Sequence, residues 1–224
     1  MSGARPGRPL LVTDCDEVLL HMVRHFGTWL GEAKDMDFAI PHGDFDQRIT
    51  RRNTGGGPGG PVTQEEMWEL LGGFFPAEMH RQTLVPHAAE ALARLGEGAD
   101  IVILTNLADE CRQPRFEQLA AFGIRHRVEC NHGGKGRAVA ALVSEYGASV
   151  TVFVDDLTSN HESVARHAPG VHRLHLVAEP ELAPTVPTSP AAHARLDDWR
   201  EAEAWIADRF AAGAPAQPLE ETTA

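Results

Sequence analysis

Lysine is nearly absent from this chain of 224 residues: only Lys34 and Lys135 occur among 20 basic residues. The arginines form no long run, and the formal net charge at pH 7 is -12. Because a duplex-binding surface needs clustered positive charge, a nucleic acid duplex is not an expected partner. The acidic balance does not exclude an anionic substrate, because a bound metal can reverse the local field inside a cleft.

Cysteine and long hydrophobic runs are scarce as well. Cys15, Cys111 and Cys130 form no CxxC pair, which favours reduced thiols and a cytoplasmic location. No apolar stretch approaches the length of a membrane-spanning helix, so a membrane is not an expected partner. Residues 1–9 lack the apolar segment of a signal peptide, and none is expected. The composition predicts no particular oligomeric state.

Apolar runs that suit buried strands alternate with helical patterns over most of the chain. With 42% hydrophobic residues, the chain is long enough for a sizeable core. Such alternation predicts a doubly wound, mostly parallel, Rossmann-like sheet between two helical layers, a three-layer α/β/α fold. The predicted strands are 9–13, 99–104, 127–130, 150–154 and 171–177, and the helices between and after them are 86–95, 114–122, 137–146, 160–167 and 197–210.

Residues 21–85 interrupt this alternation. We expect them to form a small, mostly helical cap inserted into a catalytic core that comprises residues 9–20 and 86–210. Residues 1–8 and 211–224 are rich in small residues and proline, which predicts flexible tails.

Within the cap, apolar residues at helical spacing predict a helix over residues 18–30. Residues 31–62 are polar and irregular, and the glycine-rich run Gly55 to Gly60 is a candidate mobile lid. The sequence Thr63-Gln64-Glu65-Glu66 matches a capping box, which predicts a second helix that runs through Leu71.

Polar side chains directly follow several predicted strands. Ligands of open α/β sheets bind at the carboxyl ends of the strands, where these side chains would meet. They are Asp14 and Asp16 after the first strand, Thr105 and Asn106 after the second, Lys135 at the start of the helix after the third, and Asp155 and Asp156 after the fourth.

This set has a specific chemical interpretation. Carboxylates this close together repel one another, so one or more stays protonated unless a cation binds between them. Oxygen ligands of this kind suit Mg²⁺, which is a hard cation. A phosphate group could then contact Thr105, Asn106 and Lys135. Asp14 could attack phosphorus to form an aspartyl-phosphate, and Asp16 could serve as the general acid and base.

The same residues lie in four motifs that resemble, in order, those of the haloacid dehalogenase superfamily. The resemblance implies that Asp14, the backbone carbonyl of Asp16, and Asp155 bind Mg²⁺, with Asp156 on a metal-bound water. Members that cleave carbon–halogen bonds lack an Asp at the Asp16 position, so by this resemblance its presence implies phosphoryl transfer, as in the phosphatase-type members. The motifs are Leu11-Val12-Thr13-Asp14-Cys15-Asp16-Glu17-Val18, Ile103-Leu104-Thr105-Asn106, Gly134-Lys135-Gly136 and Val152-Phe153-Val154-Asp155-Asp156.

The first motif, Asp14-x-Asp16-Glu17-Val18, also resembles the C-type 5′-nucleotidase branch, which makes a nucleotide one candidate substrate. The expected reaction is Mg²⁺-dependent hydrolysis of a small phosphomonoester. Two alternatives stay open: a phosphotransferase of the same fold, and a non-catalytic binding or regulatory protein that retains the fold. Each motif alone would be weak evidence, because Asp pairs after strands are commonly turns or caps.

Other polar residues have competing interpretations. Arg48, Arg51 and Arg52 are either a solvated loop face or an anchor for a substrate anion. His21, Arg24 and His25 lie on the predicted helix after the first motif, where one of them could face the substrate. We interpret Cys15 as a packing residue and not a nucleophile, and Asn160 and His161 as a helix cap.

Overall fold

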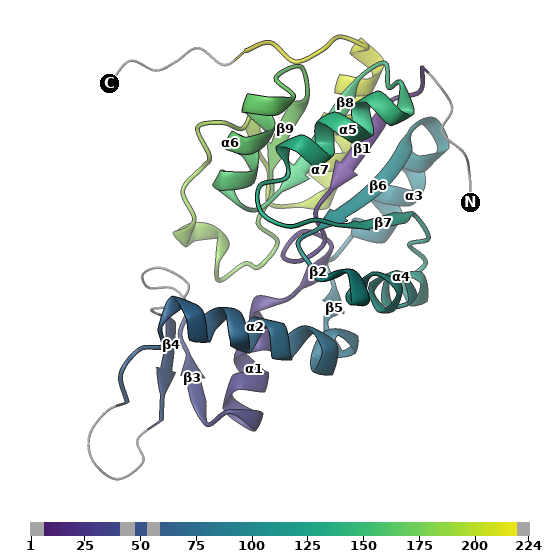
Figure 1. The fold of residues 1–224 in the computed structure, drawn as a ribbon. Coiled ribbons are helices and arrows are strands. Elements are labelled where there is room, and N and C mark those ends of the chain that lie inside the picture. The colour runs from purple at the N-terminus through teal and green to yellow at the C-terminus, as the bar shows by residue number, and fades with distance from the viewer. Residues whose placement is uncertain (1–6, 41–47, 53–58, 219–224) are drawn as a thin grey trace, which may run out of the picture.

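The computed structural model describes residues 7–40, 48–52 and 59–218. It contains a six-stranded parallel sheet with helices on both faces and a smaller unit at one end (Figure 1), which confirms the predicted α/β/α class. The strand order is β10-β9-β8-β1-β6-β7. The strands are β1 (Leu10–Thr13), β6 (Asp100–Thr105), β7 (Arg127–Cys130), β8 (Thr151–Asp155), β9 (His172–His175) and β10 (Ala194–Arg195).

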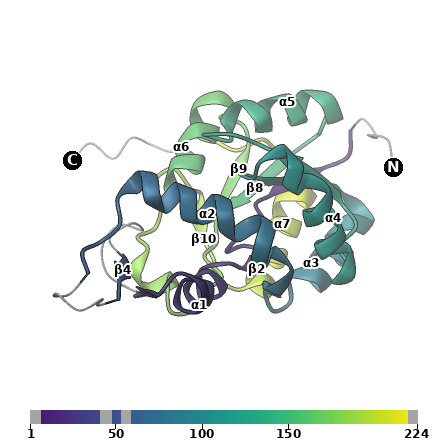
Figure 2. The same ribbon diagram turned by 60° about the horizontal axis from the view of Figure 1, so that its bottom comes forward.

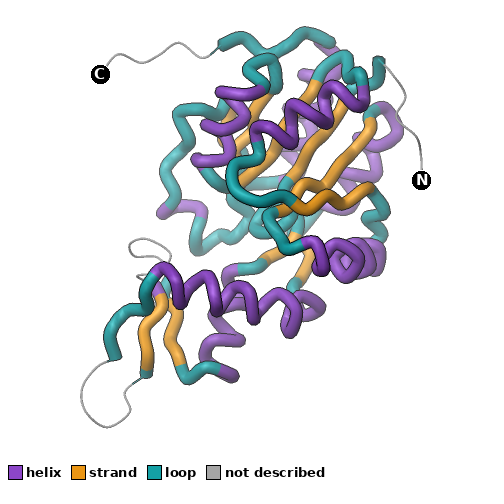
Figure 3. The backbone as a smooth tube through the Cα atoms, viewed as in Figure 1, coloured by secondary structure: helices purple, strands orange, loops and turns teal. Residues whose placement is uncertain are grey.

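Two helical layers enclose the sheet (Figure 3). Side chains alternate along β1, so that Leu10 and Val12 pack against α5 and α6 while Leu11 packs with the residues of α3, α4 and α7. Both faces of the strands are therefore buried. The helices are α5 (Gly136–Tyr146) and α6 (Thr158–His167) on one face, and α3 (Ala88–Gly98), α4 (Arg112–Ala121) and α7 (Trp199–Ala212) on the other.

The strand order explains where a site can form. From β1 the chain moves to β6 and β7 on one side, then crosses to β8, β9 and β10 on the other side. The order therefore reverses beside β1, and the carboxyl ends of β1, β6 and β8 border the crevice in which such sheets bind ligands. The backbone N–H of Asp14 donates to the carbonyl of Val154 at 2.8 Å, which holds the end of β1 against the end of β8.

The cap lies beyond this edge of the sheet (Figures 1 and 2). Its own core is aromatic, with Phe26, Trp29 and Phe74 in mutual ring contact. A short antiparallel pair, β2 with β5, connects it to the main domain. The elements are β2 (Leu20–His21), α1 (Val23–Ala33), β3 (Met36–Phe38), β4 (Ile49–Arg51), α2 (Gln64–Glu78) and β5 (Thr83–Leu84). Short 3-10 turns are Met79–Arg81, Asp109–Cys111 and Ala183–Thr185.

Two expectations for the cap are wrong. The predicted loop contains β3 and β4, an antiparallel pair whose isolated strands are too short to show a pattern in the sequence. The predicted helix over residues 18–30 begins only at Val23. The reason is a tight turn: the carbonyl of Cys15 accepts from the N–H groups of Leu19 and Leu20 at 2.8 and 2.9 Å, and Glu17 is left-handed, with φ 58°.

The capping box at Thr63 is confirmed. Thr63 Oγ1 accepts from the N–H of Glu66 at 3.2 Å, and the Glu66 carboxylate accepts from the N–H of Thr63 at 2.8 Å. The helix continues past Leu71 to Glu78, with Pro76 near its end. Most of the candidate lid, residues 55–58, lies outside the described residues.

Part of the predicted carboxyl-terminal tail packs against the main domain. The last helix runs to Ala212, and the buried Ala216 donates its N–H to the carbonyl of Gly170 at 2.9 Å. The helix therefore ends two residues beyond the predicted end at residue 210, and the flexibility of residues 211–224 stays a prediction. Among the helices in the described part of the chain, none combines the length and apolar character needed to cross a bilayer.

Candidate active site

Lys135 is the electrostatic centre of the site at the carboxyl edge of the sheet. Its ammonium lies 2.7 Å from Asp14 Oδ1 and 2.8 Å from Asp155 Oδ2, and its side chain is fully buried. Burial alone lowers the pKa of Lys135, but the carboxylates of Asp14 and Asp155 outweigh it and raise the pKa overall. The lysine therefore stays charged, as a compact cation between two strand ends.

Glycine explains how a lysine can be buried there. A Cβ on Gly136 would lie 2.1 Å from the carbonyl oxygen of Ser163, so only glycine lets α5 approach α6 this closely. The N–H of Gly136 donates to Ser163 Oγ at 2.9 Å. This close helix contact places Lys135, the residue before α5, directly over the ends of β1 and β8.

Asp155 is fixed by its neighbours. Its Oδ1 accepts from the N–H of Leu157 and from Asn160 Nδ2, each at 2.9 Å, while its Oδ2 faces Lys135. His161 Nε2 lies 3.0 Å from the Asp155 carbonyl oxygen. The helix-cap interpretation of Asn160 and His161 is wrong: both belong to the first turn of α6, and both orient Asp155 instead.

The carboxylate of Asp156, unlike that of Asp155, is not enclosed by protein donors in the described part of the chain. Asp156 is partly buried, and among the described residues its carboxylate makes no hydrogen bond or ion pair. Carboxylate oxygens of Asp14, Asp155 and Asp156 all lie within 4.8 Å of one another. Burial, followed by the charges of Asp155 and Asp14, raises the pKa of Asp156 well above its usual range.

This group of carboxylates fits a hard divalent cation. Burial raises the pKa of Asp14 to about 7, and the neighbouring Lys135 only partly opposes that shift. Without a further cation, Asp14 and Asp156 would therefore tend to hold protons near neutral pH. An all-oxygen donor set of this kind suits Mg²⁺.

Asp16 faces a different set of partners. Arg115 Nη2 donates to both of its carboxylate oxygens, at 3.0 and 3.1 Å, and Gln82 Nε2 donates to Oδ1 at 2.7 Å. Thr105 Oγ1 lies 3.5 Å from Asp16 Oδ2. Neither Arg115 nor Gln82 was predicted from the sequence, because neither belongs to a motif and only the packing of α4 against the cap linker brings them to Asp16.

Asn106 lies at the margin of the site. Its Nδ2 donates to the carbonyl of Gly133 at 3.1 Å, and its Oδ1 accepts from Asn131 Nδ2 at 2.8 Å. The side-chain amide is thus engaged by the loop that precedes Lys135.

Cys15 is buried, as expected for a packing residue. Burial raises the pKa of its thiol, which keeps it protonated and a poor nucleophile.

The cap arginines are paired within the cap. Arg51 pairs with Glu66, and Arg52 Nε donates to Asp37 at 2.7 Å. These ion pairs favour the interpretation of both as a solvated face. Arg48 precedes β4, where its carbonyl accepts from the N–H of Ala39 at 2.9 Å.

The buried position of Lys135 leads to a prediction about stability. Lys135→Met would leave two buried carboxylates without their counter-charge, which typically costs about 3–5 kcal/mol. We expect a loss of that order in the free energy of unfolding, measured by urea titration in EDTA. The matched control is Lys34→Met, because Lys34 is exposed above the Trp29 ring and its loss should cost less than about 0.5 kcal/mol. Equal effects of the two substitutions would contradict this role.

No protein-family model matches the chain, and no curated protein matches its sequence. Solved structures do resemble it. A haloacid dehalogenase-like family hydrolase from Streptococcus pneumoniae has a TM-score of 0.57 at 13% identity, over 89% of this chain and 98% of that one. A haloacid dehalogenase superfamily hydrolase of subfamily IA from Geobacter sulfurreducens has a TM-score of 0.55 at 15% identity, over 92% and 100%.

A predicted phosphoglycolate phosphatase from Haemophilus somnus has a TM-score of 0.55 at 18% identity, over 88% of this chain and 96% of that one. At these identities the likeness concerns the fold. The chain therefore has the fold of haloacid dehalogenase-like hydrolases along nearly its whole length, as the four motifs implied.

Proposed function

We propose that this chain is a Mg²⁺-dependent phosphohydrolase that cleaves a small phosphomonoester through an aspartyl-phosphate on Asp14. The observation that carries the proposal is the position of Asp14, 2.7 Å from the buried ammonium of Lys135 and beside Asp155 and Asp156. Its location at the strand-order reversal of the sheet, and the hydrolase and phosphatase folds it resembles, support the same conclusion.

The residues that would hold Mg²⁺ are Asp14, the backbone carbonyl of Asp16, and a carboxylate after β8. The sequence pointed to Asp155 for that position, with Asp156 on a metal-bound water. Asp155 Oδ1 already accepts two hydrogen bonds and its Oδ2 pairs with Lys135, whereas the Asp156 carboxylate bonds to no described protein group. We therefore assign the direct contact to Asp156 and give Asp155 the role of holding Lys135. When bound, the ion supplies positive charge that offsets the charge of the phosphate oxygens.

In the first step, a carboxylate oxygen of Asp14 forms a bond to phosphorus as the ester P–O bond breaks. The leaving oxygen takes a proton from Asp16. In the second step, water attacks the phosphorus of the aspartyl-phosphate, Asp16 accepts the proton, and the departure of phosphate restores Asp14. Lys135 and Thr105 Oγ1 stabilise the phosphate oxygens in both steps.

Asp16 cannot donate a proton while Arg115 and Gln82 occupy both of its oxygens. We infer that its carboxylate turns toward the leaving group when substrate binds. Gln82 lies on the segment that returns from the cap to β5, so movement of the cap is a direct means of releasing Asp16.

The test is release of both products from p-nitrophenyl phosphate in Mg²⁺. A phosphohydrolase releases p-nitrophenol and inorganic phosphate in equal amounts. A phosphotransferase releases less phosphate than phenol once an alcohol acceptor is added, and a non-catalytic protein releases neither. A screen of phosphorylated metabolites, nucleotides among them, would then identify the substrate.

Asp16→Asn should affect substrates unequally. Asparagine keeps the shape of the side chain but cannot donate the proton, and acid–base help is worth about 10²–10⁴-fold. We expect a loss of that size in kcat/KM for alkyl phosphates and a much smaller loss for p-nitrophenyl phosphate, whose phenolate leaves without protonation. Asp109→Asn, at an exposed aspartate outside the site, is the matched control and should change neither. Equal losses on both substrates would exclude the acid role.

A further inference from the structure

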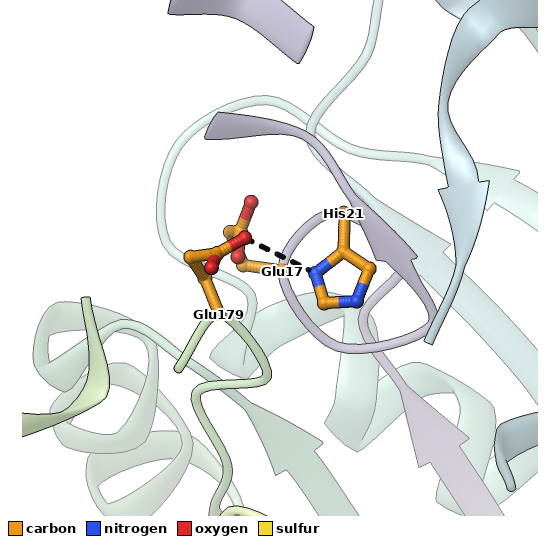
Figure 4. Close-up of side chains that lie close together, drawn as sticks. All are labelled: Glu17, His21 and Glu179. Carbon is orange, nitrogen blue, oxygen red and sulfur yellow. Dashed lines mark ion pairs between the residues drawn. The ribbon is translucent and has the colours of Figure 1, made fainter. Parts of the chain in front are cut away.

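A second group of potential metal ligands lies outside the Asp14 site. It consists of Glu17 in the turn after β1, His21 on β2, and Glu179 in the loop after β9 (Figure 4). One ligand atom from each lies within 4.8 Å of the others. The three residues are 2, 5 and 2% exposed, so this is a buried group and not a solvated acidic surface.

Two of these side chains each have a buried polar atom with no hydrogen-bond partner in the described part of the chain. Among the described residues, neither Glu17 Oε2 nor His21 Nδ1 has a hydrogen-bond partner, although both atoms are buried. Leaving a buried carboxylate oxygen and a ring nitrogen unsatisfied is costly unless another species binds there. Figure 4 shows His21 Nδ1 turned toward the Glu179 carboxylate, with the Glu17 carboxylate beside it.

The separation of His21 from Glu179 suits two ligands of one metal ion. His21 Nδ1 lies 3.4 Å from Glu179 Oε2, without the geometry of a hydrogen bond. Two ligands with bonds of about 2.0–2.1 Å at a tetrahedral angle are separated by roughly 3.3 Å.

Other contacts hold the ligands in place. Glu17 Oε1 accepts from the N–H groups of Met22, at 2.7 Å, and Val23, which leaves Oε2 free to face His21 and Glu179. Glu179 accepts from Arg24 Nε at Oε2 and from Arg24 Nη2 at Oε1, at 2.7 and 2.8 Å. Each carboxylate oxygen has two lone pairs, so Oε2 keeps one that can face an ion. Such outer contacts are how metal sites orient their ligands. When Glu17 and Glu179 are both ionised, the single positive charge of Arg24 leaves the group with a net negative charge.

We propose that Glu17, His21 and Glu179 bind one divalent transition-metal ion of the Zn²⁺ type, at a site distinct from that of Asp14. An imidazole with two carboxylates suits Zn²⁺ or Co²⁺, whereas Mg²⁺ favours ligand sets made only of oxygen. The ion would join His21, on the strand that leads into the cap, to two residues of the main domain. It would therefore restrain the base of the cap.

The alternative is a metal-free network in which a proton is shared among the same groups. The two are separated by metal binding to the full-length protein after chelator treatment and dialysis, in excess Mg²⁺ that occupies the Asp14 site. We expect one equivalent of Co²⁺ per chain, with a visible absorption band of bound Co²⁺, and displacement of that band by Zn²⁺. Absence of bound Co²⁺ and Zn²⁺ in the wild type would overturn the proposal.

Substitutions of the proposed ligands then test where the ion binds. His21→Gln should weaken Co²⁺ binding by more than the roughly 10–100-fold that loss of an outer partner costs. The matched control is His25→Gln: His25 lies nearby on α1, contacts Thr83 Oγ1 at 3.1 Å, and should bind Co²⁺ as the wild type does. Glu179→Gln is the second ligand variant, and circular dichroism checks the fold of each.

Asp14→Asn should retain the Co²⁺ equivalent, which separates this site from the proposed catalytic one. Loss of the band in Asp14→Asn, or wild-type binding by His21→Gln and Glu179→Gln, would refute the assignment. The result does not depend on phosphatase activity, so failure of either proposal leaves the other intact.

Discussion

Asp14→Asn is expected to lower kcat by on the order of 10⁴–10⁶-fold, the loss typical of removing one member of a covalent catalytic unit. The amide has nearly the size of the carboxylate but is not a nucleophile, so no aspartyl-phosphate can form. Because attack is required for every substrate, the loss should be similar for good and poor leaving groups. Initial rates with p-nitrophenyl phosphate and an alkyl phosphate measure it.

Acid-quenched samples supply the control for Asp14→Asn. Wild-type protein and Asp16→Asn should both trap phosphate on the chain, and Asp16→Asn should trap more because no base activates the water. Asp14→Asn should trap none. Substantial turnover by Asp14→Asn, or a trapped phosphate in it, would disprove the role of nucleophile.

Removal of divalent metal is expected to abolish turnover. The charge that Mg²⁺ supplies to a phosphoryl group is worth several kcal/mol, which corresponds to a loss of about 10³-fold or more. EDTA should therefore eliminate activity, and added Mg²⁺ should restore it. Titration of the restored rate against Mg²⁺ concentration measures the affinity of the site.

Variants of Asp155 and Asp156 separate the ligand from the residue that positions Lys135. Asp156→Asn should shift the Mg²⁺ titration to much higher concentration while leaving the free energy of unfolding nearly unchanged, because its carboxylate bonds to no described protein group. Asp155→Asn should lower the stability, because it leaves the buried Lys135 with one carboxylate fewer. The reverse pattern would support the assignment of Asp155 as the direct ligand, and full activity in EDTA would exclude the metal mechanism.

Elements held by local interactions can be predicted from the sequence, whereas elements held by distant contacts cannot. The alternation of strands and helices is visible in the sequence because β1, β6 and β8 are continuous apolar runs with polar residues at their ends. In contrast, β3 and β4 of the cap have three residues each. Strands this short have no periodicity of their own and form because they pair with each other beside α1 and α2.

The turn after Asp16 shows why a local pattern can mislead. Apolar spacing from Val18 onward suits a helix, yet Glu17 adopts a left-handed conformation and its carboxylate caps α1 at Met22 and Val23. That arrangement depends on Trp199 as well, whose Nε1 donates to the carbonyl of Val18 at 2.7 Å from the far end of the chain. No window of neighbouring residues contains this information.

Sequence alone was sufficient for the fold class and for the group around Asp14, since parallel strands bring their carboxyl ends to one edge whatever the details of packing. The exceptional Lys135 was also recognisable, in a chain that otherwise uses arginine. The tertiary structure was needed to find that Arg115 and Gln82 hold Asp16, that Asp155 and not Asp156 is enclosed by protein donors, and that Glu179 meets Glu17 and His21. The contacts of Asp16, and those of Glu179 with Glu17 and His21, join residues that are far apart in the sequence, and they depend on how helices, turns and the cap linker pack. The donors to Asp155 Oδ1 are local, but which of the two adjacent carboxylates they enclose depends on the turn from β8 into α6, which no periodicity encodes.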